Sequence, residues 1–172
     1  SGRIRKRAEA KKDSNSTVVS TKNIAALEDV QFAHLHNHTQ FSVLQSTMQI
    51  SNIVKTAAKD NMSAVALTDT GTMMAALHFV SAALNHNKAA EEKNKELKAK
   101  GETPTETILK PIVGCEFNIC ENHLDKSKKD NGYQVVLLAK NKNGYHNLAK
   151  MSSIAFVDGF YYVPRIDKVI VE

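Results

Sequence analysis

The chain has few cysteines, prolines and aromatic residues. Its 172 residues include no tryptophan, three prolines and two cysteines, and only 6% are aromatic. Cys115 and Cys120 lie five positions apart and match neither a CxxC pair nor a disulfide framework, so we expect reduced thiols and a cytoplasmic location. No apolar run approaches the ~18 residues of a membrane span, and the amino end lacks a signal-peptide hydrophobic region. A disulfide scaffold and a membrane partner are therefore not expected.

The excess of basic charge is concentrated at the amino end. The formal net charge is +5, and residues 1–13 alone hold six basic and two acidic side chains, a net +4. The rest of the chain is therefore close to neutral. A basic tail can add salt-dependent affinity for phosphates, but such charge runs are more often solvated linkers. We predict a basic, weakly ordered linker or tail at residues 1–30, and a pure DNA-binding module is the weakest hypothesis.

Hydrophobic patterns in the rest of the chain predict strands that alternate with helices. Strands are expected at 32–38, 64–67, 109–119 and 133–139, and helices at 50–58, 73–84 and 143–155. Residues 88–105 form a charged helical stretch, interpreted as an insertion or helix extension that Gly101 and Pro104 end. This order is typical of an α/β fold with mainly parallel strands.

Three histidines stand at every second position of the first predicted strand, at His34, His36 and His38. Alternation along a strand places them on one face, ~7 Å from neighbour to neighbour. Imidazoles so arranged can bind a shared metal ion. The alternative is a chance cluster on a solvent-facing strand, and spacing alone does not separate the two.

Several blocks of sequence carry a family resemblance. They are FAHLHNHT at 32–39, FSVL at 41–44, AVALTDTG at 64–71, PIVGCE at 111–116, VLLAKN at 136–141 and GFYYVPRID at 159–167. With these blocks in this order, the chain resembles the PHP domain (polymerase and histidinol phosphatase), most closely the version in bacterial DNA polymerase III alpha subunits.

The resemblance implies a partial, distorted β/α barrel. Residues 31–172 would be the N-terminal part of a PHP domain, and the chain reads as a segment of something longer. Barrel closure removes edge strands, so we expect a partial barrel to expose one. We therefore expect that the fragment is unstable alone, self-associates through that open edge, or rearranges.

The resemblance also implies a metal site. Active PHP domains hydrolyse phosphoesters with a cluster of divalent metals that activates water. His36 and His38 match the paired histidines of the family and Glu116 matches its glutamate, whereas His34 is not counted. Zinc or manganese would be the ion if the site is retained.

Three other ligand positions of the family are changed in this chain, where they are Gln45, Thr70 and Gln134. Glutamine and threonine are poor ligands for zinc or manganese beside imidazole and carboxylate. We therefore expect a degenerate site in which metal binding is weak or absent, with no cofactor and no catalytic residue in this chain.

The remaining polar residues receive structural interpretations. Asp69 is expected to stabilise a turn, and Cys115 to be a small buried hydrophobe. The block at 161–165 could stack on nucleic acid, but packing in a turn is favoured. No partner is identified for four histidines, which are His78, His86, His123 and His146.

Two hypotheses of different class follow. The first is a non-catalytic scaffold in a replicative DNA polymerase, a nucleotidyltransferase, with the remaining polymerase domains, a proofreading exonuclease domain and, through the parent protein, DNA as partners. The second is a metal-dependent phosphoesterase or 3′–5′ proofreading nuclease that uses His36, His38 and Glu116. A free-standing PHP phosphatase is a third and weaker alternative.

Overall fold

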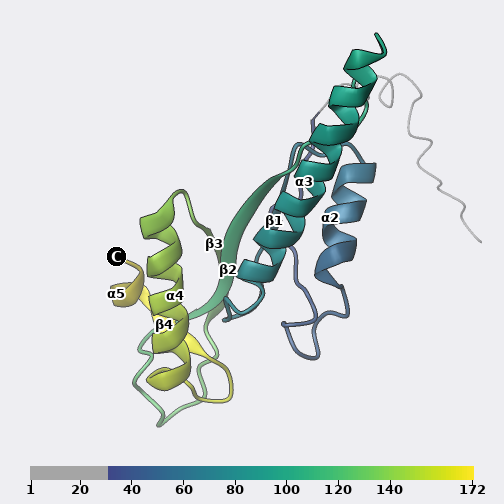
Figure 1. Ribbon diagram of the computed structural model, residues 1–172. Coiled ribbons are helices and arrows are strands. Elements are labelled where there is room, and N and C mark those ends of the chain that lie inside the picture. Colours follow the sequence, from purple (N-terminus) through teal and green to yellow (C-terminus); the bar gives the residue numbers. More distant parts are fainter. Residues whose placement is uncertain (1–30) are drawn as a thin grey trace, which may run out of the picture. The chain divides into compact units, whose positions relative to one another are not determined.

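The computed structural model describes residues 31–172 (Figure 1), so the predicted basic tail at residues 1–30 lies outside the described residues. In chain order the elements are α2 (Ile50–Lys59), β1 (Ala64–Leu67), α3 (Ala76–Ala99), β2 (Lys110–Cys120), β3 (Tyr133–Leu138), α4 (Lys142–Val157), β4 (Arg165–Asp167) and α5 (Lys168–Val171). No helix in this part of the chain combines the length and apolar character that crossing a membrane requires.

The predicted strand at 32–38 is wrong, although the segment does run beside β1. The N–H groups of Ala66 and Thr68 donate to the carbonyls of His34 and Asn37, both at 2.9 Å. The return bonds come from side chains, because the Asn37 amide donates to Ala66 O at 2.9 Å and Asn37 N–H donates to Thr68 Oγ1 at 2.9 Å. Polar side chains thus form the hydrogen bonds that backbone groups would form in a regular parallel pair of strands, and for this reason the segment is not a strand.

The sheet is built around β2, which is the longest strand. Its first half pairs in parallel with β1, and its second half pairs with β3 on one edge and β4 on the other. The α/β class is confirmed, but β3 is antiparallel because residues 121–132 return the chain through a loop without a crossover helix. Within residues 31–172 the four strands form a mixed sheet that does not close into a barrel.

The helix predicted at 73–84 and the charged stretch after it form the single helix α3. Side-chain amides pin the returning chain against this helix. Asn87 accepts from Leu109 N–H at 2.8 Å and donates to Leu109 O at 2.7 Å, and Asn94 brackets Glu106 in the same way. Gly101 has φ +76°, the left-handed conformation common after a helix. The charged stretch is therefore a helix extension.

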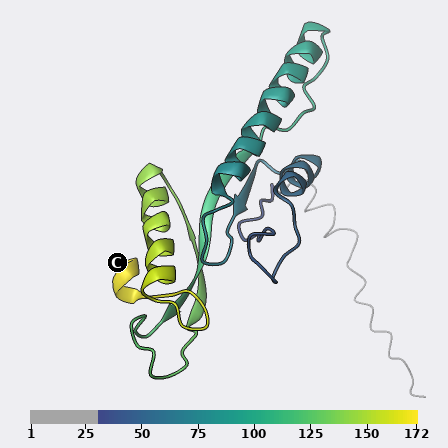
Figure 2. The same ribbon diagram turned by 60° about the horizontal axis from the view of Figure 1, so that its bottom comes forward.

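Two hydrophobic cores lie along β2, and Figure 2 shows α3 beside one part of this strand and α4 beside the other. The first is formed by α2, β1 and α3 and includes Phe79 and Leu109. The second lies under α4 and β4 and includes Phe117, Ile166 and Cys115. Burial raises the pKa of the Cys115 thiol to about 12, so the expected small buried hydrophobe is confirmed. Because β2 contributes to both cores, its residues between them are held rigidly.

Candidate metal centre and its hydrogen-bond network

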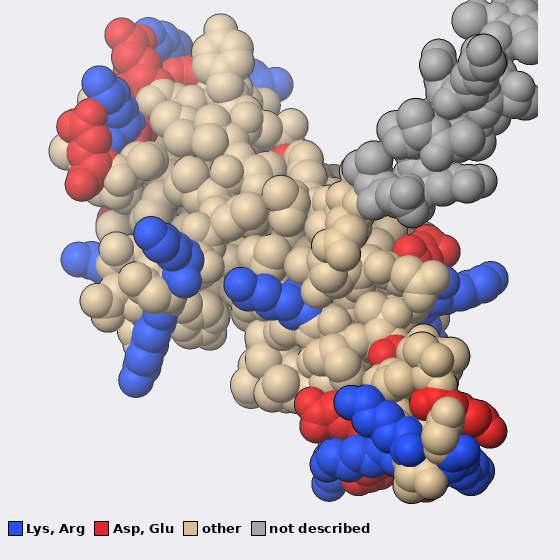
Figure 3. All heavy atoms as spheres, turned by 90° about the horizontal axis from the view of Figure 1, so that it is seen from above, with Lys and Arg blue, Asp and Glu red and all other residues tan. Residues whose placement is uncertain are grey.

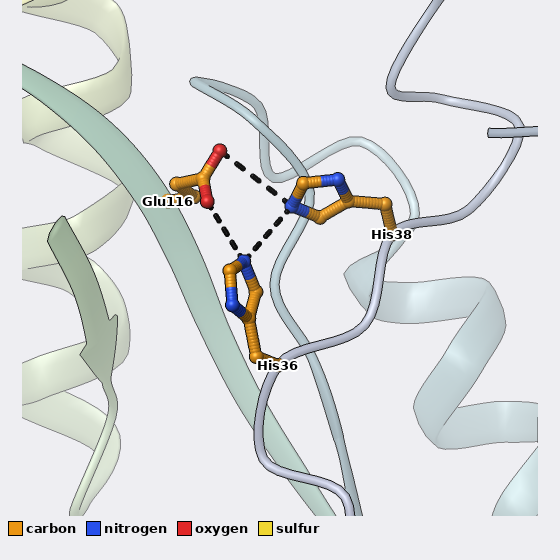
Figure 4. A group of neighbouring side chains, drawn as sticks. All are labelled: His36, His38 and Glu116. Atoms are coloured by element: carbon orange, nitrogen blue, oxygen red, sulfur yellow. Dashed lines mark hydrogen bonds and ion pairs between the residues drawn. The ribbon is translucent and has the colours of Figure 1, made fainter. Parts of the chain in front are cut away.

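Two histidines and one glutamate converge between the irregular segment at 32–38 and β2 (Figure 4). His36 Nε2 lies 2.7 Å from Glu116 Oε2 and 3.2 Å from His38 Nε2. His38 Nε2 lies 3.6 Å from Glu116 Oε1. The three candidate ligand atoms lie within 4.8 Å of one another, so the group could hold a metal ion.

Glu116 is fixed by the backbone around it. Its N–H donates to Asp69 O at 3.1 Å, and its carbonyl accepts from Gly71 N–H at 2.7 Å. These bonds continue the β1–β2 pairing past the end of β1, as a parallel bridge between Thr70 and Glu116. The Glu116 side chain is 3% exposed, so its carboxylate must find partners inside the protein.

Two of the three positions that depart from the family pattern supply such partners, and the third bonds to one of these two. Thr70 Oγ1 lies 3.0 Å from Glu116 Oε1, and Gln134 Nε2 donates to the same oxygen at 3.0 Å. Thr70 Oγ1 also lies 2.6 Å from Gln45 Oε1. A hydroxyl has one proton, which Thr70 donates to Glu116. The contact with Gln45 is also a hydrogen bond when the Gln45 amide turns its NH₂ group toward Thr70 and donates to the hydroxyl oxygen. We call Gln45, Thr70, Glu116 and Gln134 the carboxylate network.

The donors available fit one ion better than a cluster. His36, His38 and Glu116 offer two imidazole nitrogens and a carboxylate, a set that suits zinc or manganese. Gln45, Thr70 and Gln134 are poor ligands for further ions, because they are neutral and their polar groups already form hydrogen bonds within the carboxylate network. A metal at the three-residue group would also have to displace the 2.7 Å hydrogen bond between His36 and Glu116.

Asp69 stabilises the turn that follows the histidine segment, as predicted. It is 1% exposed and accepts hydrogen bonds from Thr39 N–H at 2.6 Å, Thr39 Oγ1 at 2.7 Å and Ser42 Oγ at 2.7 Å. This buried carboxylate therefore ties residues 39–42 to the end of β1. The histidines just before the turn are positioned as a consequence.

Two hollows flank the network. One of about 470 Å³ lies on the histidine side, and its lining includes His34, His36, His38, Met48, Ile53 and Val65. The other, of about 770 Å³, is lined by neutral and aromatic side chains that include Phe41, Thr70, Asn118, Tyr133, Gln134 and Phe156. His34 thus contributes to a cavity wall and does not join the three-residue group, in agreement with the prediction that set it aside.

The sequence interpretation gave His123 no partner, but it forms a buried pair with Asp167. The distance from His123 Nδ1 to Asp167 Oδ2 is 2.5 Å, and His123 N–H donates to the same oxygen. The other Asp167 oxygen accepts from Ile170 N–H and caps α5. An acidic residue directly before a helix is a recognisable capping signal, but nothing in the sequence links it to His123.

Arg165 is completely buried, so the turn-packing interpretation of its block is confirmed at this residue. Its guanidinium donates to the carbonyls of Gly159, Asp130, His123 and Asp125 at 2.8–3.2 Å. A buried arginine with these partners cannot stack on nucleic acid. Instead it holds the loop between β2 and β3 against β4.

Acid should weaken the protein through Asp167. Burial by itself raises the pKa of this carboxyl, but hydrogen bonds from His123 outweigh burial, and the pKa lies below the ordinary 3.8. The folded state therefore favours the ionised form. The resulting stability is complete above the ordinary pKa and is lost as pH falls through the lower folded-state pKa. We expect Asp167→Asn to flatten the fall in unfolding free energy below about pH 4, measured by urea titration.

A matched variant tests the cause of that acid sensitivity. His123→Gln removes the side chain that lowers the pKa of Asp167, so it should flatten the same acid limb while Asp167 is kept. An acid limb of unchanged steepness in both variants would contradict the pairing.

A family model described as "PHP domain" matches residues 34–172. The DNA polymerase III subunit alpha of Borreliella burgdorferi is 39% identical over 142 residues, which cover 80% of this chain and 10% of that protein. The proteins of the same name from Treponema pallidum and Helicobacter pylori are 36% and 33% identical over 142 residues, covering 80% and 82% of this chain and 10% of each relative. The chain thus spans about a tenth of the length of these relatives.

Proposed function

The chain belongs to the PHP domain family, and from this premise we propose that it serves DNA replication as a structural module of a bacterial DNA polymerase III alpha subunit. In this proposal residues 31–172 are the N-terminal part of the PHP domain, residues 88–105 are a charged insertion whose first part extends α3 as far as Ala99, and residues 1–30 are a linker. The location would be the cytoplasm. The module itself would not catalyse a reaction.

The carboxylate network is the observation that carries the structural role. Glu116 Oε1 is engaged by Thr70 and Gln134, and Oε2 is engaged by His36. A buried carboxylate that is fully hydrogen-bonded stabilises the fold without an ion. The network joins the histidine segment, the end of β1, β2 and β3, which is the work expected of a scaffold.

The proposed partners are the remaining polymerase domains and a proofreading exonuclease domain. Several large apolar side chains are exposed, such as Val43, Leu44 and Val157, and exposed apolar surface is typical of protein contacts. Contact with DNA would come through the parent protein. On the face drawn in Figure 3, Lys and Arg gather beside Asp and Glu and do not form a stripe of one sign, which is a poor electrostatic footprint for DNA.

A metal-dependent phosphoesterase or 3′–5′ nuclease is the second candidate, because the three-residue group could hold an ion. His36, His38 and Glu116 would be the ligands. A bound divalent ion would supply an activated water and neutralise phosphate charge. The hollow beside Thr70 and Gln134 would then receive the substrate.

Hydrolysis of a chromogenic phosphodiester in the presence of added zinc or manganese separates the two candidates. The structural proposal predicts the same rate for the chain, for His36→Ala and for a protein-free blank. Turnover that depends on metal and disappears in His36→Ala would support the phosphoesterase and overturn the structural proposal. Lys142→Ala, at an exposed lysine, is the control. Activity of the chain itself would be lost in His36→Ala and kept in Lys142→Ala, whereas activity of a contaminant would be the same in both variants.

A further inference from the structure

The outer edge of β3 presents unpaired backbone groups. Ala139 N–H donates to Val113 O at 2.8 Å, which fixes the direction of the backbone at the end of the strand. Because the direction of the backbone N–H and C=O groups alternates along a strand, these groups of residues 133, 135 and 137 also point toward β2. Gln134, Val136 and Leu138 therefore direct their N–H and C=O groups outward. Within residues 31–172, β2 is the one strand that pairs with β3.

This edge has none of the usual protection. Proteins discourage edge pairing with charged residues, proline or bulges. Residues 131–139 contain no charged residue and no proline, and β3 itself reads YQVVLL. Tyr133 is 86% exposed and Val135 is 38% exposed. An uncharged strand with high β propensity and a free edge is a template for another strand.

We propose that β3 pairs with β3 of a second copy of this chain, in antiparallel orientation about a two-fold axis. An antiparallel edge is complementary to itself, so one strand supplies both halves of a closed interface. In a register centred on Val136, Val136 of each copy exchanges both backbone hydrogen bonds with its counterpart. The two sheets then become one continuous sheet.

Charge at the ends of the strand agrees with this arrangement. In the register centred on Val136, Asp130 of one copy faces Lys142 of the other, and a register centred on Val135 places it opposite Lys140 instead. Either register sets opposite charges across the interface and leaves the centre uncharged, so there is no like-charge repulsion. A second copy is therefore a better occupant than a strand that carries charge at its centre.

Sedimentation velocity over a concentration series tests the proposal. The chain should pass from monomer to dimer as concentration rises. Val135→Lys should weaken dimerisation about tenfold or more, because it places two lysines close to the two-fold axis. Val169→Lys is the matched control, since Val169 is 80% exposed and lies on α5. Circular dichroism establishes that each variant is folded.

Hydrogen exchange then locates the interface. At concentrations that favour the dimer, the amides of Gln134, Val136 and Leu138 should become protected, while those of Val135 and Leu137 should be protected in monomer and dimer alike. A chain that stays monomeric at all concentrations would overturn the proposal. A dimer that Val135→Lys does not weaken, or one without the alternating protection, would also overturn it. The proposal does not depend on the function proposed above.

Discussion

Replacing Arg165 with methionine is expected to lower the free energy of unfolding by about 4 kcal/mol or more. Methionine keeps much of the volume but removes the donors that now satisfy four backbone carbonyls. Each buried group left without a partner costs roughly 1–3 kcal/mol. Urea unfolding followed by circular dichroism measures the loss, which is a large fraction of the roughly 5–15 kcal/mol that stabilises an ordinary domain.

Two further variants show that geometry, and not charge alone, is responsible. Arg165→Lys keeps the positive charge but cannot reach four acceptors from one ammonium group, so an intermediate loss is expected. Lys129→Met removes a positive charge near Tyr162 on the surface and should leave the midpoint almost unchanged. A loss below about 1 kcal/mol in Arg165→Met, comparable to an ordinary surface change, would contradict the role assigned to this arginine.

Replacing Glu116 with leucine is expected to cost about 3 kcal/mol of stability, because the carboxylate network loses its common acceptor. Thr70, Gln134 and His36 would each keep a polar group aimed at an apolar side chain. The measurement is again the free energy of unfolding from urea titration. Since the network acts without an ion in this account, a chelator should leave the midpoint of the unaltered chain where it was.

Glu116→Gln is the matched variant for the network. Its amide keeps the shape of the side chain and one oxygen acceptor, so the loss should be clearly smaller than for leucine. Glu121→Gln is a surface control, because the exposed Glu121 carboxylate pairs with the exposed Lys128. Equal losses for leucine and glutamine at position 116 would show that charge, and not hydrogen bonding, dominates there. A large loss of stability on addition of a chelator would show that a bound ion, and not the hydrogen bonds of the network, stabilises this site.

Local pattern was sufficient to predict most of the fold. In α2 the buried residues Ile53, Val54 and Ala57 recur at helical spacing, and the helix lies where that spacing predicts it. Strand β1 is a short apolar run and is buried as such a run predicts. The strand prediction at 32–38 was wrong because Asn37 and Thr68 bond through their side chains. Such contacts between distant segments leave no periodic signal in the sequence.

The residues of the candidate site could be predicted from the sequence, whereas the network around them could not. The resemblance named His36, His38 and Glu116, and the structure brings these three together. It also identified the changed positions at Gln45, Thr70 and Gln134, but composition alone does not say that neutral side chains from three segments will bond to one carboxylate network. The partners of Arg165 and the His123–Asp167 pair were not predicted for the same reason. Arg165 bonds to the backbone of a distant loop, and Asp167 lies 44 positions from His123.

The most direct test of the structural account is the metal content of the chain, purified without chelator and measured by elemental analysis beside His36→Ala and His38→Ala. We expect zinc, manganese and iron well below one ion per chain in all three proteins. One or more ions per chain in the unaltered protein, lost in both variants, would contradict it and make the three-residue group a working metal centre.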